Sequence, residues 1–255
     1  WSAPVDISQT GGLSRDPVLT GDSHGTLHIV WGEGPPGDRS IVYSQRPAQG
    51  FWSRHLRIPG TGEATDNKGL VIDREGTVFL AWNDGDQVFL SLKPEGENWG
   101  SPEPVSVPSM QSLSQDIAID RRDVVHVAWE VWKDGAARIL YRQRRVDGGW
   151  SSSLFLSGTE RSASGAKLAV DPNGRLHTLW LRDPGPEEET PSLMLSCQPL
   201  GGSNSIPGVV HEGHVSSLQT IAVDGSEVIH ALVSGAVGDR GDPSIRYVIV
   251  PALCG

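Results

Sequence analysis

The sequence predicts an all-β fold, a five-bladed β-propeller made of four-stranded antiparallel blades. Three observations predict it. The chain of 255 residues is rich in turn formers, with 31 Gly and 18 Pro, while 37% hydrophobic residues are enough for a buried core. A ten-residue pattern recurs at the spacing of propeller blades. The N-terminal segment also matches the outer segments that follow the other copies of the pattern.

The repeated pattern is D-x-x-G-x-x-H-x-x-W, an Asp before a tight turn followed by an alternating strand. It is complete in DSHGTLHIVW at 22–31 and DPNGRLHTLW at 171–180. Weaker copies lie at 73–82, where Phe79 replaces His, at 120–129 and at 224–233. The copies follow one another at about 50 residues, which is typical of a four-stranded propeller blade.

Each copy continues with a second alternating segment and, in most copies, with a segment led by Trp52, Trp99 or Trp150. The last copy lacks this outer segment, but WSAPVDIS at the start of the chain resembles it. We therefore expect Trp1 to Ser8 to close the ring as the fourth strand of the last blade, because an open ring would leave a blade edge able to pair with another chain. The expected blades of this single domain, 1–255, are 13–58, 65–107, 114–157, 164–211 and 217–253 plus 1–8.

The repeated residues are expected to be structural. Histidines at one register of successive blades are spread around a ring, so they cannot converge on one metal ion, and we predict no metal and no cofactor. We expect them to pack in the core or between blades with one ring nitrogen hydrogen-bonded. Each repeated Asp should accept backbone N–H bonds and hold its hairpin, and each repeated Trp should fill the wedge between blades. The four histidines are His28, His126, His177 and His230.

Charge and cysteine content restrict the partners. The net charge of −10 argues against nucleic acid and against an anionic membrane surface, and no apolar run is long enough for membrane insertion. Because the chain starts at Trp1 without a leader, we expect a mature or excised segment. Cys197 and Cys254 allow one disulfide, and two buried free thiols are an equal alternative. The protein is expected to be a monomeric ring or a domain of a larger assembly.

Function is expected where the blades differ. The loops that enter the innermost strands and the loops that join the second and third strands share one face of a propeller; the second set is long and acidic. The other face carries only tight turns. We therefore expect the binding site on the long-loop face, where Trp132 could stack on a sugar ring; the alternative is a partly buried loop Trp among solvated acids. The expected hydrogen-bond acceptors for sugar hydroxyls are Glu33, Asp84, Glu130 and Asp134.

The repeats resemble the Asp-box, or BNR-like, propellers of the sialidase superfamily, which occur in bacterial surface and secreted proteins. The resemblance rests on the D-x-x-G-x-x-H-x-x-W and W-S-x-P segments and covers essentially the whole chain. It implies a secreted or cell-surface protein. Sialidase activity would need an arginine cluster, a Tyr–Glu nucleophile pair and an Asp acid. LRIP at 56–59 resembles the arginine-bearing motif of that family, but it ends an outer strand instead of opening an innermost one.

A second resemblance is to five-bladed glycosidases of the arabinanase and fructosidase type, which place carboxylates at the starts of innermost strands. Arg15-Asp16-Pro17 resembles their opening, and Asp66 and Asp116 hold comparable positions. Neighbouring carboxylates could supply an acid and a base. The preferred hypothesis is an extracellular module that binds a glycan or glycoprotein without catalysis. The alternatives are a protein-interaction or structural propeller of a larger surface assembly, and a glycoside hydrolase using Asp16, Asp66 and Asp116.

Overall fold

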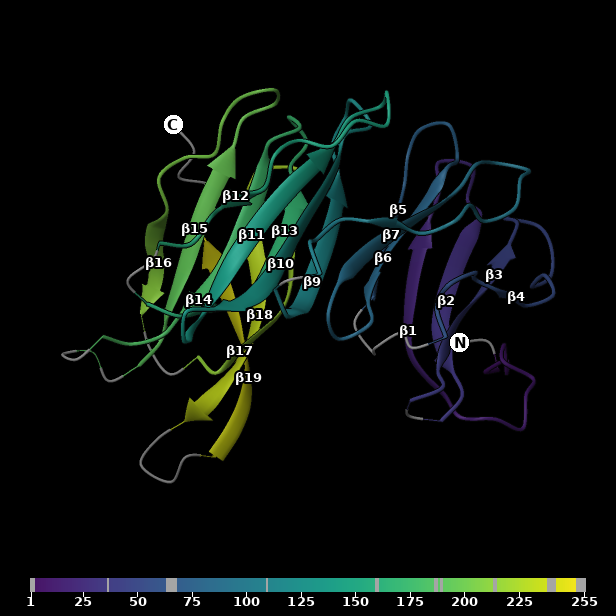
Figure 1. The fold of residues 1–255 in the computed structure, drawn as a ribbon, viewed down its shortest axis with the longest axis horizontal. Helices are drawn as coiled ribbons and strands as arrows, with labels where there is room; N and C mark the ends of the chain where they lie inside the picture. The colour runs from purple at the N-terminus through teal and green to yellow at the C-terminus, as the bar shows by residue number, and fades with distance from the viewer. Residues whose placement is uncertain are drawn as a thin grey trace. The chain divides into compact units, whose positions relative to one another are not determined.

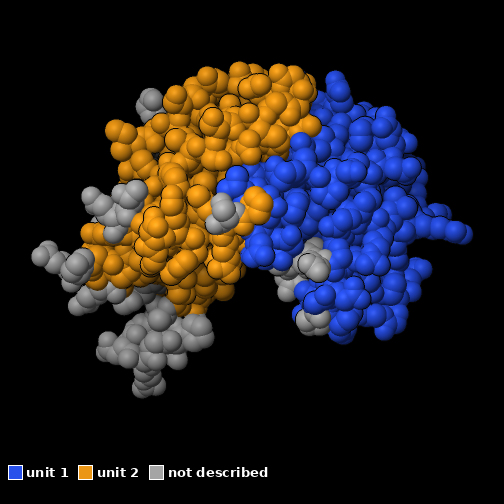
Figure 2. Space-filling model, viewed as in Figure 1, with its two compact units in different colours: residues 1–107 blue, residues 108–255 orange. Residues whose placement is uncertain are grey.

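The computed structural model describes residues 3–35, 37–62, 68–108, 110–158, 161–185, 188, 190–212, 215–237 and 242–250. These residues form strands and turns and no helix, so they contain no helix that could cross a membrane. The chain divides into two compact units, 1–107 and 108–255, which Figure 2 shows in two colours.

The first unit holds two antiparallel sheets of four strands, each formed by strands that are consecutive in the chain (Figure 1). The first sheet contains β1 (Ser14–Gly21), β2 (Leu27–Glu33), β3 (Ser40–Arg46) and β4 (Leu56–Arg57). The second contains β5 (Lys68–Ile72), β6 (Val78–Asn83), β7 (Val88–Lys93) and β8 (Glu103–Pro104).

The second unit holds three more antiparallel sheets. The third sheet contains β9 (Ser112–Ile119), β10 (Val125–Lys133), β11 (Ala136–Arg144) and β12 (Leu154–Phe155). The fourth contains β13 (Ala163–Val170), β14 (Leu176–Arg182), β15 (Ser192–Gln198) and β16 (Gly208–Glu212). The fifth contains β17 (Ser217–Val223), β18 (Ile229–Val237) and β19 (Asp242–Val250).

These five sheets confirm the predicted fold class, an all-β five-bladed β-propeller. Each sheet lies in one predicted blade, except that β9, β13 and β16 extend one or two residues beyond the predicted bounds. The boundary between the two units falls between the predicted second and third blades. The register follows the repeat, since the strand that carries each His pairs with the strand before it and the strand after it. The assignment of 1–255 to a single domain stays a prediction.

The expected closing strand is not formed by the described part of the N-terminal segment. Residues 3–8 lie in no strand, and the fifth sheet has three strands in the described residues. Local bonds explain this difference. The Asp6 carboxylate accepts hydrogen bonds from the Ser8 hydroxyl at 2.9 Å and from the Gln9 N–H at 3.2 Å. The Ile7 carbonyl, which strand pairing would use, lies 2.7 Å from Nε2 of His55 in the first blade.

The repeated Asp has the predicted structural role in all five blades. In the first copy, Oδ1 of Asp22 accepts the N–H groups of His24 at 2.9 Å and Thr26 at 2.7 Å. The same two bonds, to the residues two and four positions later, recur in the other copies. The carboxylate thus satisfies donors that the tight turn leaves without a strand partner. The other four residues are Asp73, Asp120, Asp171 and Asp224.

The repeated His connects this Asp to the third strand of its own blade. Nδ1 of His28 lies 2.7 Å from the Tyr43 hydroxyl, and its Nε2 lies 3.5 Å from the Asp22 carboxylate. The third and fifth blades repeat this arrangement with His126 and Tyr141 and with His230 and Tyr247. In the second blade both members of the His–Tyr pair are replaced. Phe79 stands at the His position and Leu90 at the Tyr position. These contacts confirm that the histidines are part of the scaffold.

The four repeated tryptophans are buried, as expected for residues that fill the blades. Trp31, Trp82, Trp129 and Trp180 are all at most 4% exposed. Trp82 belongs to the core shared by the first two blades and Trp180 to the core shared by the third and fourth. Burying such side chains is a large part of what stabilises each unit.

Cys197, on β15, is disulfide-bonded. The chain has one other cysteine, Cys254, which lies outside the described residues. Sγ of Cys197 also lies 3.6 Å from Nδ1 of His177, so in the fourth blade a sulfur takes the place that the Tyr hydroxyl has in the first and third. The choice that the sequence left open, a bridge or free thiols, is therefore decided for Cys197.

The Asp–His pairs should make the protein sensitive to acid. Burial alone would raise the pKa of the Asp22 carboxyl, but hydrogen bonds from Thr26 and His28 outweigh it and lower that pKa below its ordinary 3.8. Burial lowers the pKa of His28 below its ordinary 6.5. The unfolded chain therefore takes up protons at higher pH than the native protein does, at both groups, and stability falls as protons are added.

We expect the melting temperature to fall in two steps, first as the pH drops below about 6.5 and again below about 4, where the carboxyls titrate. Thermal unfolding followed by circular dichroism between pH 7 and pH 3 measures both steps. The double variant H28F/Y43L copies the second blade into the first and should reduce the first step. An unchanged loss between pH 7 and pH 5 in this variant would show that His28 does not cause it.

Candidate functional site

A pocket of about 410 Å³ lies in the second unit, where the third and fourth blades pack together. It opens at the end of the blades where β13 begins, β14 ends and β15 begins. This is the long-loop face that the sequence predicted for a site. The residues that line it are Ser157, Gly158, Arg161, Ala163, Trp180, Arg182, Met194 and Pro207.

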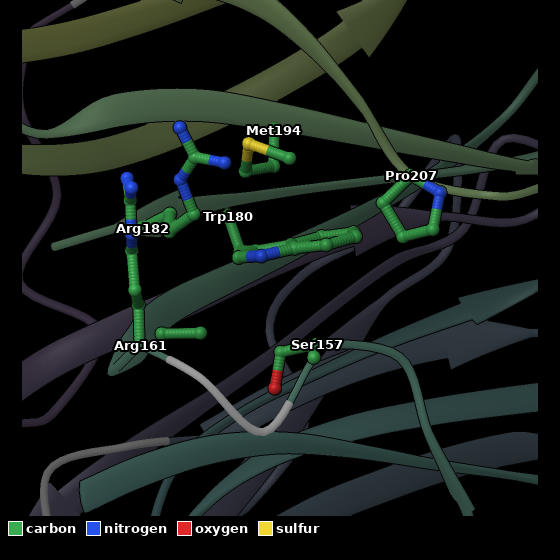
Figure 3. Close-up of a pocket in the computed structure, with 8 residues that line it drawn as sticks. Ser157, Arg161, Trp180, Arg182, Met194 and Pro207 are labelled. Carbon is green, nitrogen blue, oxygen red and sulfur yellow. The ribbon is translucent and has the colours of Figure 1, made fainter. Parts of the chain in front are cut away.

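The strand register gives the pocket an apolar floor and a basic edge. Trp180 pairs with Met194, and Arg182, two residues further along the same strand, pairs with Ala163. Side chains two residues apart in a strand point to the same face. Figure 3 shows the Trp180 indole at the centre, Pro207 on one side, and both arginine side chains on the other. The pocket size is that of small-ligand sites, and its composition suits a ligand that is partly apolar and partly polar.

The basic edge is held in place by its neighbours. The carbonyl of Arg161 accepts a hydrogen bond from the Arg138 guanidinium at 3.2 Å, and Oγ of Ser162 accepts the Ala137 N–H at 3.3 Å. Both donors belong to β11 in the third blade. The Arg182 guanidinium donates to the Ser192 hydroxyl at 3.3 Å. Bonds to neighbouring strands therefore hold the backbone at Arg161 and the side chain of Arg182 in place.

One carboxylate, that of Glu188, contacts both arginines. Its Oε1 lies 2.6 Å from Nη1 of Arg161 and 3.6 Å from Nη2 of Arg182. Its Oε2 accepts the Gly185 N–H at 3.3 Å. The hydrogen bond from Arg161 and the bond from Gly185 lower the pKa of Glu188 below its ordinary value, so the group is ionised near neutral pH. Each arginine side chain is about one-third exposed or less.

Two predicted residues, Glu130 and Asp116, lie in the same pair of blades, further from the long-loop face than the pocket edge. Glu130 on β10 is half-buried, and its Oε2 lies 3.3 Å from the N–H of Gly165 on β13. Gly165 has φ +65° in a bulge of β13, a conformation that favours glycine and brings this N–H to the carboxylate. Burial, and to a lesser extent the charge of Asp183, raise the pKa of Glu130.

Asp116, on β9, also contacts β13. Its Oδ2 accepts the Leu168 N–H at 2.7 Å, and burial raises the pKa of its carboxyl although Lys167 opposes the shift. Asp116 and Glu130 are thus two carboxyls of raised pKa on paired strands. Raised carboxyl pKa values are common at functional sites, and they also occur in structural polar networks.

The other predicted residues of the second unit lie on the hairpin between β10 and β11. Trp132 is 52% exposed at the end of β10, so its ring is accessible, as sugar stacking would require. Asp134 is exposed and has φ +52°, in the turn that joins the two strands. Neither residue lines the pocket.

The predicted acceptors of the first unit are engaged in their own blades. Glu33 accepts hydrogen bonds from Thr10 at 2.7 Å, Ser14 at 2.7 Å and the Trp31 indole at 2.9 Å. These bonds outweigh the effect of burial and lower its pKa. Asp84 caps the turn between β6 and β7 by accepting two backbone N–H groups.

Asp16, one of the three carboxylates of the hydrolase hypothesis, is exposed at a bulge of β1 with φ +52°. It lies near Lys68, the first residue of β5. Burial lowers the pKa of Lys68 to about 8, although the Asp16 charge raises it. Asp66 lies outside the described residues.

The arginine pair was not predicted from the sequence. Two positions after the repeated Trp, the successive blades have Glu33, Asp84, Val131, Arg182 and Gly235. Arg182 is the one basic residue at this register. The change of sign could have identified it, but only acceptors for sugar hydroxyls were predicted from the sequence. Arg161 lies in a loop outside the ten-residue pattern, so only the fold brings it beside Arg182.

No protein family model matches this chain, and no curated protein sequence matches it. The resemblance to Asp-box propellers therefore stays a prediction. Solved structures do match. The polysaccharide lyase Uly1 has a TM-score of 0.65 at 9% identity, with 100% of this chain and 73% of that chain covered. A family PL25 ulvan lyase bound to -[GlcA(1-4)Rha3S]- has a TM-score of 0.64 at 12% identity, with 92% and 66% covered.

An α-L-arabinanase from Penicillium chrysogenum, complexed with arabinobiose, has a TM-score of 0.63 at 12% identity, with 94% of this chain and 81% of that chain covered. The present chain therefore spans just under two thirds of the PL25 lyase and about four fifths of the arabinanase. At these identities the likeness shows the fold alone.

Proposed function

We propose that this protein is a carbohydrate-binding β-propeller that holds a glycan in the pocket between its third and fourth blades. The pocket carries the proposal, because its apolar floor and polar edge match the two kinds of surface on a sugar ring. Structural neighbours described as two polysaccharide lyases and an arabinanase add support, since each of them acts on a glycan.

We propose binding without catalysis, on the surface of a cell or in a secreted form. The disulfide at Cys197 supports an extracytoplasmic location, because structural disulfides persist mainly in oxidising compartments. The pocket edge supports binding, since it presents guanidinium groups, and the described residues that line the pocket include no carboxylate. General acid–base hydrolysis of a glycosidic bond needs two carboxyls beside the bond.

A glycoside hydrolase is the second candidate, and one observation favours it. The pKa of Asp116 is raised by burial, which suits a general acid that must be protonated near neutral pH. If the protein hydrolyses a glycan, new reducing ends will appear with the wild type and disappear with Asp116→Asn. Such turnover would replace the non-catalytic proposal.

A bulky side chain placed in the pocket by substitution tests the binding proposal. A Cβ at Gly158 meets nothing within 4 Å, so Gly158→Trp places a large ring at the pocket wall without backbone strain. Gly225→Trp is the matched control, because Gly225 is equally open and lies in the turn between β17 and β18, at the opposite end of the blades. We expect wild type and Gly225→Trp to bind the same glycans on an array, and Gly158→Trp to bind them at least about 10-fold more weakly.

The same array distinguishes the other outcomes. If Gly158→Trp binds as wild type does while Trp132→Ala loses binding, the glycan site is on the exposed indole and not in the pocket. If no glycan on a panel of neutral, uronate-containing and sulfated oligosaccharides binds the wild type, the proposal is wrong and a protein partner takes its place.

A further inference from the structure

We infer that the pocket takes an acidic sugar, and that Glu188 occupies the place of the ligand's anionic group when the ligand is absent. The inference rests on the proposed function and adds the chemical class of the ligand. It is carried by one arrangement, in which a single carboxylate oxygen lies within ion-pair distance of both arginines at the pocket edge.

The contacts of Glu188 show which donors at this place face an anionic group. One carboxylate, that of Glu188, lies within reach of the Arg161 guanidinium, the Arg182 guanidinium and the Gly185 N–H. A planar guanidinium with several donors suits carboxylate and sulfate groups, and charge-assisted bonds of this kind are stronger than neutral ones. A uronate carboxylate or a sulfate ester on a sugar ring has the same charge and the same acceptor oxygens as Glu188.

Arg182 retains unused donor capacity. Nε of Arg182 is buried and has no hydrogen-bond partner among the described residues, while its Nη2 reaches Glu188 only at 3.6 Å. Glu188 therefore bonds closely to Arg161 and loosely to Arg182. A ligand anion seated deeper in the pocket could engage both guanidinium groups, which an exposed loop carboxylate does only in part.

Glu188 is also well placed to leave. It lies on the chain between β14 and β15, its carboxylate is about one-third exposed, and the Gly185 N–H belongs to the same loop. Because Glu188 lies in no strand, we expect the strands that position the arginines to stay unchanged when its charge is removed. Glu188 thus acts as an internal competitor, so that only a ligand with its own anionic group can compensate for displacing it.

The test compares Glu188→Gln with Glu227→Gln. Glu227 forms an equivalent ion pair with Arg175 at 2.7 Å, between the tight turns of the fourth and fifth blades, so the control loses the same charge away from the pocket. The probes are tetragalacturonate, its full methyl ester and a sulfated carrageenan tetrasaccharide, each titrated by calorimetry at low and physiological salt. The two acidic probes distinguish a carboxylate ligand from a sulfate ligand.

We expect Glu188→Gln to bind at least one acidic probe about 10-fold more tightly than wild type, and Glu227→Gln to bind it as wild type does. Arg182→Gln should abolish the preference for that acidic probe over the methyl ester. If the methyl ester binds the wild type as well as the acid does, and Glu188→Gln changes neither, the inference is overturned while glycan binding stands. If none of the three probes binds any variant, the inference is also overturned, and the broader array then decides the proposed function by itself.

Discussion

Replacing Asp171 by Ala should destabilise the protein by about 3–5 kcal/mol, because one carboxylate serves three donors in a buried setting. Asp171 accepts the N–H groups of Asn173 at 2.8 Å and Arg175 at 2.9 Å, and Nε2 of His177 lies 3.0 Å from its second oxygen. The side chains of Asp171 and His177 are both fully buried. Without the carboxylate, the imidazole N–H loses its acceptor where water cannot replace it.

Asp73→Ala provides the matched control for this prediction. Asp73 holds the same kind of turn through two backbone N–H groups, but Phe79 stands at the His register of its blade. Only the turn bonds are lost, so we expect a cost of about 1–2 kcal/mol. Urea unfolding of both variants measures the difference. Equal losses would mean that the buried Asp–His contact contributes nothing beyond the turn.

Cys197→Ser should cost about 4 kcal/mol, because the disulfide removes the entropy of a long loop from the unfolded chain. For a protein of this size the melting temperature should fall by roughly 10 °C. A reducing agent should lower the melting temperature of the wild type to that of Cys197→Ser and leave the melting temperature of the variant unchanged. Cys254→Ser should give the same loss, and the double variant no further loss.

Two outcomes would contradict the stabilising role of the disulfide. One is a cysteine variant whose melting temperature equals that of the wild type under oxidising conditions. The other is a variant that remains sensitive to the reducing agent, since no second disulfide is available in a chain of two cysteines.

The fold was predictable because it is repeated. Five copies of one pattern, each with an Asp at a turn and an alternating strand after it, define the blades and assign the Asp, His and Trp residues to the scaffold. The closing strand could not be predicted in the same way. The likeness of residues 1–8 to the outer segments describes local pattern, while the bonds of Asp6 and Ile7 depend on neighbours that the pattern does not include.

The candidate site was predictable only in its location. The long-loop face follows from blade topology, and the pocket opens there. Its residues were harder to identify, because Trp180 was correctly assigned to the core and also forms the pocket floor. Arg161 and Glu188 belong to loops that differ from blade to blade, so their meeting with Arg182 depends on tertiary structure alone.

The joint exchange of His and Tyr for Phe79 and Leu90 has an evolutionary consequence. A single change from His to Phe would take one polar partner away from the buried Tyr hydroxyl, and a single change from Tyr to Leu would leave a ring nitrogen of the His without its partner. The double exchange removes the His ring and the Tyr hydroxyl together, so neither is left without the other. A change from the His–Tyr pair to the Phe–Leu pair therefore passes through a less stable single variant. We expect strong epistasis between these two positions in every blade that retains the His–Tyr pair.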